Sequence, residues 1–153
     1  MDISIYKNRR ENLLELLPEN SVLLIPGAET QYRNSDSSFP FRQESNFYYL
    51  SGFCEPASLI AITKKDNQIT SLIFVPPKDK LKEKWDGCRA GPIGAVKDFL
   101  FDKAYDNTQI DEMLPDILFG SDIVLYPIGK KNGFDQKVID WTCLLYTSDA
   151  ADE

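Results

Sequence analysis

The chain has 153 residues, of which 42% are hydrophobic and 27% are charged, a size and balance typical of one globular domain with its own core. This composition excludes a disordered tail and a small disulfide-stapled protein. The formal net charge of −7 repels phosphate backbones, so we expect no nucleic acid among the partners. The chain contains no histidine, and the commonest general base and transition-metal ligand are therefore both missing.

Cysteine usage and apolar runs indicate the compartment. Cys54, Cys88 and Cys143 have neither metal-like nor paired spacing, which is typical of a reducing compartment. The start of the chain is polar and lacks the apolar segment of a signal peptide. The longest apolar runs, such as Val22–Pro26 and Leu72–Pro77, are too short to cross a bilayer. We therefore expect a cytoplasmic location and no membrane contact.

The first predicted elements are a helix and a buried strand. Residues Ile5–Leu17 have helical spacing of apolar positions, and Arg9 and Arg10 are assigned to the solvent-facing side. Pro18 ends this helix, because the residue before a proline is pushed out of the helical region. The continuous apolar run Ser21–Ile25 predicts a strand that is buried on both faces.

Two further strands form a predicted hairpin in the middle of the chain. Residues Thr30–Pro40 are polar and turn-rich and predict a loop. Ser58–Thr63 and Ile69–Val75 predict strands that are joined by a link of about five residues. A hairpin requires antiparallel neighbours, so the sheet cannot be all parallel.

The second half of the chain alternates predicted helices with a strand. Pro92–Phe101 predicts a short helix whose Val96, together with Phe99 or Leu100, points inward. Thr108–Leu118 has apolar positions at helical spacing, with Thr108 and Asp111 as candidate caps and a kink expected at Pro115. The next expected elements are a strand at Ile123–Tyr126 and a last element from about Asp135. The expected fold is α/β, a mixed sheet flanked by helices on both faces.

Outside the segment Phe39–Pro56, few residues are candidates for a catalytic, phosphate-binding or metal-binding site. Glycines at 87–94 and 129–133 lack the spacing of a phosphate loop and predict turns. A thiolate at Cys54 or Cys88 would lack a histidine base. The acidic residues between Asp86 and Asp116 are spread over different elements, which disfavours a metal site built from carboxylates alone.

Residues Phe39–Pro56 form the densest segment of the sequence. Six aromatic side chains lie in it: Phe39, Phe41, Phe47, Tyr48, Tyr49 and Phe53. Gly52 permits a tight turn, and Arg42 is a rigid fork for carboxylates or carbonyls. The simplest interpretation is an aromatic-lined core loop in which Arg42 pairs with Glu44 or Glu55.

This segment resembles the signature of the aminopeptidase P amino-terminal domain, R-Q-x-S-x-F-x-Y-x-x-G. The matching residues are Arg42, Gln43, Ser45, Phe47, Tyr49 and Gly52. Downstream, Trp85–Gly91 is similar to the tryptophan–x–G–x–R–x–G turn of the same family. The resemblance extends from about Tyr6 to Trp141 and implies the same α/β fold.

The resemblance also implies a function. In that family the domain is non-catalytic and serves homo-oligomer assembly and the substrate entrance. A second domain holds two divalent metal ions, usually manganese, and cleaves the bond before proline in proline-containing peptides. By this resemblance Trp85 is a substrate-binding wall residue and Arg89 supports it. The alternative is that Trp85 caps the core while Arg89 pairs with Asp86.

Because the family's five metal ligands have no counterparts in this sequence, we expect no metal and no peptidase activity from this chain alone. A prolidase has the same layout and is an alternative parent, as is a peptidase-like interaction protein that has lost its chemistry.

The last residues differ in character from the rest of the chain. Residues 143–153 read CLLYTSDAADE, which resembles, residue for residue, the translation of a sequencing-library transposon adaptor. We therefore expect an amino-terminal domain at 1–142, truncated at its C-terminal end, and an artificial tail at 143–153 that packs against nothing. The alternative is a genuine C-terminal tail.

Overall fold

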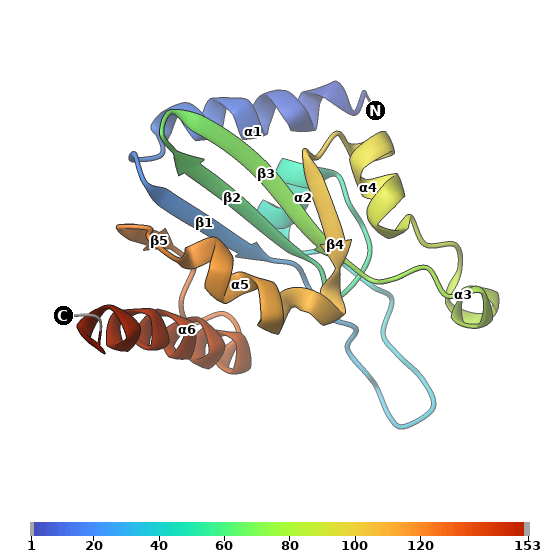
Figure 1. The fold of residues 1–153 in the computed structure, drawn as a ribbon. Coiled ribbons are helices and arrows are strands. Elements are labelled where there is room, and N and C mark those ends of the chain that lie inside the picture. The colour runs from blue at the N-terminus through green and yellow to red at the C-terminus, as the bar shows by residue number, and fades with distance from the viewer. Residues whose placement is uncertain (1, 152–153) are drawn as a thin grey trace.

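The computed structural model describes residues 2–151, apart from the side chains at 132 and 145–151. Its elements are α1 (Ser4–Leu16), β1 (Ser21–Pro26), α2 (Ser45–Ser51), β2 (Leu59–Lys65), β3 (Gln68–Val75), α3 (Lys80–Asp86), α4 (Gly91–Phe99), β4 (Lys103–Asp106), the 3-10 turn η1 (Asn107–Gln109), α5 (Ile110–Leu118), β5 (Ile123–Leu125) and α6 (Asn132–Ala151). The strands form one sheet in the order β4-β3-β2-β1-β5 (Figure 1).

The sheet is mixed, as the sequence predicts. β2 is antiparallel to both β1 and β3, whereas the edge strands β4 and β5 are parallel to β3 and β1. The β2–β3 link is shorter than expected, because Lys65 pairs with Gln68 and only Asp66 and Asn67 lie between the strands. Both have positive φ, at 52° and 59°, which such short polar residues tolerate and which matches the twist of a tight hairpin.

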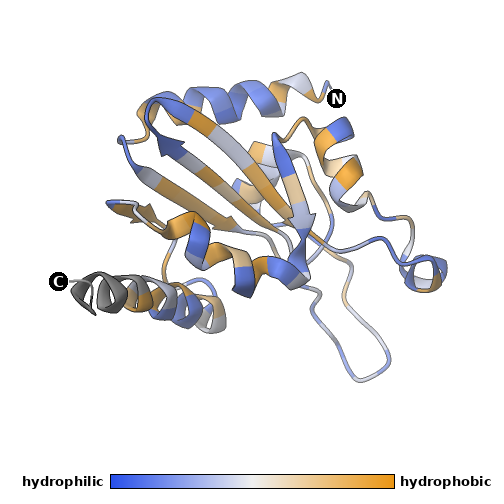
Figure 2. Ribbon diagram, in the orientation of Figure 1, coloured by the Kyte–Doolittle hydropathy of each residue, from blue (hydrophilic) through white to orange (hydrophobic). Residues whose placement is uncertain are grey.

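Side chains alternate between the two faces of the sheet and build two cores. One face packs against α1, α2 and α4 through Ile25, Ile60, Ile62, Ile73 and Val75. The other packs against α5 and α6 through Val22, Leu24, Leu59, Ala61, Leu72 and Phe74. The central strands are hydrophobic along most of their length (Figure 2). The predicted architecture, with helices on both faces, is confirmed.

The two helices predicted in the second half of the chain, α4 and α5, are present, but some of their predicted details are wrong. In α4 the inward position is Ala95, whereas Val96 is 40% exposed and its predicted burial is wrong. Phe99 points inward as predicted and meets Phe53 edge to face at 4.9 Å. Helix α5 contains Pro115, and η1 rather than a side chain of Thr108 or Asp111 leads into it.

Arg10 contradicts its assignment to the solvent-facing side of α1, since the residue is only 2% exposed. Its guanidinium donates hydrogen bonds to the carbonyls of Leu50, Phe99 and Leu100 at 2.7, 3.0 and 2.8 Å. It also lies 4.0 Å from the ring centre of Phe101. Burial lowers the pKa of Arg10 to about 10, which leaves the group charged at neutral pH. The positive charge therefore satisfies carbonyls at the C-terminal ends of α2 and α4.

Helix α6 runs through the boundary expected between residues 142 and 143. It buries Val138 and Trp141, while Cys143 and Leu144 are exposed. The remaining side chains of the expected tail, and residues 152–153, lie outside the described part. Within residues 2–151, no helix combines the length and the apolar character needed to cross a membrane.

Candidate functional site

Trp85 lies on α3, a short helix that stands away from the sheet (Figure 1). α3 has no buried residue, and Trp85 is 90% exposed. Leu81, one helical turn earlier and therefore on the same side, is 72% exposed. The alternative in which Trp85 caps the core is therefore wrong. The helix presents two large apolar side chains to its surroundings.

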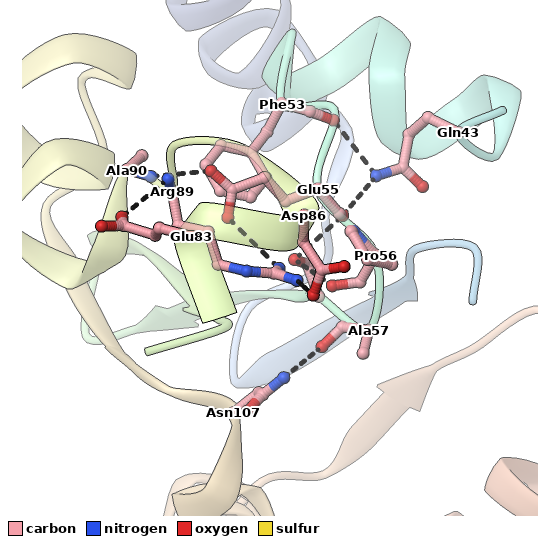
Figure 3. Close-up of polar contacts among 11 residues, drawn as sticks. Gln43, Phe53, Glu55, Pro56, Ala57, Glu83, Asp86, Arg89, Ala90 and Asn107 are labelled. Carbon is pink, nitrogen blue, oxygen red and sulfur yellow. Dashed lines mark hydrogen bonds and ion pairs between the residues drawn. The ribbon is translucent and has the colours of Figure 1, made fainter. Parts of the chain in front are cut away.

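The segment that follows α3 turns back toward the sheet. Gly87 ends the helix with φ of 88°, a conformation that favours glycine. The backbone amide of Arg89 then donates to Glu83 at 2.9 Å, and that of Ala90 donates to Glu55 at 2.7 Å (Figure 3). Two carboxylates, one on α3 and one just before β2, thus fix consecutive peptide groups.

Arg89 is mostly buried and lies between acidic groups. Its guanidinium is 3.6 Å from Asp86 and 4.0 Å from Glu55, so the expected pairing with Asp86 is present. Burial raises the pKa of Glu55 above its usual value, while the Ala90 hydrogen bond and Arg89 act in the opposite direction. The guanidinium of Arg89 therefore holds the turn that follows α3. Arg89 lies four residues after Trp85 in the sequence, but its charge is mostly buried.

The side-chain amide of Gln43, a residue of the signature segment, is fully hydrogen bonded. Its side-chain oxygen accepts from the amides of Ala28 and Glu44, at 2.7 and 3.0 Å. Its side-chain nitrogen donates to the carbonyls of Phe53 and Glu55, at 3.1 and 3.0 Å. All four hydrogen-bonding positions of the amide are used. Gln43 thus clamps the segment before β2 to the end of β1.

The rest of the signature forms helix α2, whereas the sequence predicts a core loop for this segment. Glu44 caps its start by accepting from Phe47, and Phe47 is fully buried. Gly52 ends it with φ of 67°. The predicted pairing of Arg42 with Glu44 or Glu55 is wrong: Arg42 is exposed, and among described residues Glu44 pairs with Lys130. Three of the six aromatic residues, Phe39, Tyr48 and Tyr49, are exposed rather than part of a core.

A separate cleft of about 560 Å³ lies between α1, α2 and the segment that follows β5. Leu13, Leu23, Ile25 and Tyr126 are among its lining residues. No residue of α3 and neither Glu55 nor Arg89 lines it in the described part of the chain. The cleft and the Trp85 region are therefore distinct features.

The resemblance places its metal ions in a second domain, and the described residues form no site for them. Among the residues described by the structure, no group of three or more His, Cys, Asp or Glu side chains could hold a metal ion. The acidic side chains of Glu55, Glu83 and Asp86 instead contact Arg89 and two backbone amides.

Comparisons with known proteins agree on one family. A family model described as the N-terminal domain of aminopeptidase P matches residues 6–126. Intermediate cleaving peptidase 55 of Saccharomyces cerevisiae is 34% identical over 124 residues, 79% of this chain and 24% of that protein. The Xaa-Pro aminopeptidase of Haemophilus influenzae is 34% identical over 74% of this chain and 26% of its own, and that of Escherichia coli is 32% identical over 82% and 29%.

Solved structures show the same fold. Proline aminopeptidase P II from Yersinia pestis superposes with a TM-score of 0.92 at 30% identity, covering 99% of this chain and 35% of that chain. An Escherichia coli aminopeptidase P structure gives a TM-score of 0.93 at 29% identity. The chain spans about a quarter of the length of the curated relatives it matches, with shares of 24% to 29% in the three named above.

Proposed function

Since the chain belongs to the aminopeptidase P N-terminal domain family, we propose that it is the non-catalytic domain of a Xaa-Pro aminopeptidase. The parent enzyme would release the first residue of a peptide whose second residue is proline. The curated relatives named above are Xaa-Pro aminopeptidases and an intermediate cleaving peptidase, which favours an aminopeptidase over a prolidase. We place this enzyme in the cytoplasm, with proline-containing peptides as substrates and neither nucleic acid nor membrane as partners.

The proposed work of the domain is to assemble a homo-oligomer and to wall the substrate entrance. The observation that carries this proposal is the exposure of Trp85 on α3. Trp85 and Leu81 expose large apolar side chains on the same side of α3, and adjoining exposed apolar surface, unlike a single exposed residue, marks a contact site. An indole ring has a flat face that stacks well on a proline ring. In the assembled enzyme, α3 would lie at the entrance to an active site.

Catalysis would reside outside the residues described. A pair of manganese ions in the proposed parent would supply an activated water for peptide hydrolysis, and no cluster in the described part of this chain fits such a site. We therefore propose that this chain alone releases no amino acid from a proline-containing tripeptide when manganese is added. Metal-dependent release by the purified chain would contradict that proposal.

The experiment that tests the entrance role replaces Trp85 with alanine in an enzyme that carries this domain ahead of a catalytic domain. We expect kcat/KM for a proline-containing tripeptide to fall by about tenfold or more, equivalent to about 1.4 kcal/mol of transition-state binding. The melting temperature should stay nearly constant, because the ring contacts no core residue in this domain.

Tyr32→Ala provides a matched control. Tyr32 is also an exposed aromatic residue, at 72%, but it lies on a different loop, and we expect its removal to leave the kinetics unchanged. A Trp85→Ala enzyme that unfolds several degrees earlier with unaltered kinetics per folded molecule would disprove the entrance role.

A further inference from the structure

We propose that Glu55 is the positioning residue that fixes the Trp85 arm, residues 78–90, against the sheet. The inference deepens the proposed function, on which its kinetic consequence rests, because an entrance wall must be held in place to discriminate between substrates. The anchoring itself is a property of this chain and can be tested without activity.

Packing reaches the end of the arm, where the partly buried Ala90 lies against a hydrophobic core, but it does not hold the helix that carries Trp85. Helix α3 buries no residue, and most of the arm's polar contacts are internal. Asp79 caps the helix by accepting from Leu81 at 2.9 Å, and Glu83 accepts from Arg89. Among the described residues, the side chain outside the arm that is both hydrogen bonded and ion paired to it is Glu55, through the Ala90 amide and the Arg89 guanidinium.

Glu55 is itself rigidly held. Its carbonyl accepts from Gln43 at 3.0 Å and from the hydroxyl of Ser58 at 3.3 Å. Gln43 is in turn bonded to the end of β1 through Ala28. A continuous path of hydrogen bonds therefore runs from the sheet through Gln43 and Glu55 to Ala90 (Figure 3). The side chain is mostly buried, so water competes weakly for the Ala90 amide.

The hydrogen bond matters more than the charge in this geometry. The carboxylate oxygen lies 2.7 Å from the amide of Ala90, at the short end of the range for N–H···O hydrogen bonds. The other oxygen lies 4.0 Å from Arg89, the outer limit of an ion pair. Glutamine preserves the acceptor and removes the charge, whereas alanine removes both. The two substitutions therefore separate positioning from charge pairing.

The test uses 5-fluorotryptophan incorporated into the full 153-residue chain. The two tryptophans, Trp85 and Trp141, give separate fluorine resonances, and Trp141 is buried on the opposite core. In Glu55→Ala we expect the Trp85 resonance to relax more slowly, because the arm becomes more mobile, with Trp141 unchanged. The Ala90 amide should exchange with solvent about tenfold faster or more. Glu55→Gln should retain the wild-type behaviour of both probes.

Ala90→Pro removes the same hydrogen bond from the other partner, and the φ of −69° at Ala90 is compatible with proline. If Glu55→Ala changes the Trp141 resonance, and therefore the core, Ala90→Pro replaces it as the test of the anchoring role. Unchanged relaxation of the Trp85 resonance in whichever variant leaves Trp141 intact would overturn the anchoring role. Because these spectra need no activity, a Trp85→Ala enzyme with normal kinetics would refute the entrance proposal and leave the anchor standing.

Discussion

The role of Arg10 is determined by its contacts with α2 and α4 rather than by its position on α1. One buried guanidinium hydrogen bonds with three carbonyls from α2 and the end of α4. These carbonyls would otherwise be left without donors, and an unsatisfied buried polar group costs about 1–3 kcal/mol. The charge of Arg10 thus stabilises the contact of three helices on one face of the sheet.

Replacing Arg10 with methionine should lower the free energy of unfolding by about 3 kcal/mol. Methionine fills much of the space but supplies no donor to the three carbonyls. Urea unfolding followed by circular dichroism measures the loss. Lys7→Ala is the control on the same helix: its exposed pair with Glu11 should contribute less than about 0.5 kcal/mol. Equal losses in both variants would contradict the proposed role of Arg10.

Glu55 should give the domain a pH dependence of a defined sign. Burial raises its pKa above 4.5 in the folded state, so the folded chain binds more protons than the unfolded chain between 4.5 and the raised pKa. The stability of the wild type should therefore fall, relative to Glu55→Gln, as the pH rises through that window. Urea unfolding of both proteins from about pH 4 to 7 measures the difference. A relative gain in stability with rising pH would mean that Arg89 dominates the titration of Glu55.

At the scale of elements, apolar patterns predict most of the helices and strands and miss the two seven-residue helices. Helices α1 and α5 follow from repeated apolar spacing, and the strands β1, β2 and β3 follow from short, largely apolar runs. Helix α6 is expected from the sequence only as an element of unassigned type that starts near Asp135. Helices α2 and α3 have seven residues each, too few for a repeat, and depend instead on side-chain caps at Glu44 and Asp79. Burial of Arg10 was also missed, since its acceptors lie 40 to 90 positions away in the chain.

The candidate site was found only in part. Trp85 and Arg89 follow from a family resemblance, and the entrance role assigned to them remains a prediction. From the sequence, Glu55 is expected only as a possible ion-pair partner of Arg42. Its actual partner is a backbone amide 35 residues away, which no side-chain pattern reveals.

Helix α2 offers a test of its C-terminal cap. Gly52 has φ of 67°, and a methyl group there would lie 2.6 Å from the ring of Tyr6. Gly52→Ala should therefore cost about 1 kcal/mol for the backbone conformation and about 1–3 kcal/mol more for the overlap. Thermal unfolding of Gly120→Ala isolates the first contribution, because Gly120 has φ of 73° and nothing within 4 Å. Equal losses at both positions would show that Tyr6 moves aside freely.

At the scale of the whole molecule, the expected tail can be tested by deletion. Among the described residues of α6, those that pack against the sheet, including Val138 and Trp141, precede residue 143. Removing residues 143–153 should therefore shift the melting temperature by less than about 2 °C. A fall of about 2–4 °C or more, which corresponds to about 1 kcal/mol or more in a domain of this size, would show that the tail belongs to the fold.

The edges of the sheet have a consequence for behaviour in concentrated solution. The long strands β2 and β3, with seven and eight residues, lie inside the sheet, whereas the edge strands β4 and β5 have only four and three. An edge strand carries unpaired amides and carbonyls that can recruit a strand from another molecule. Edges this short offer an incoming strand few backbone bonds, so the fold disfavours the edge-to-edge growth that leads to amyloid.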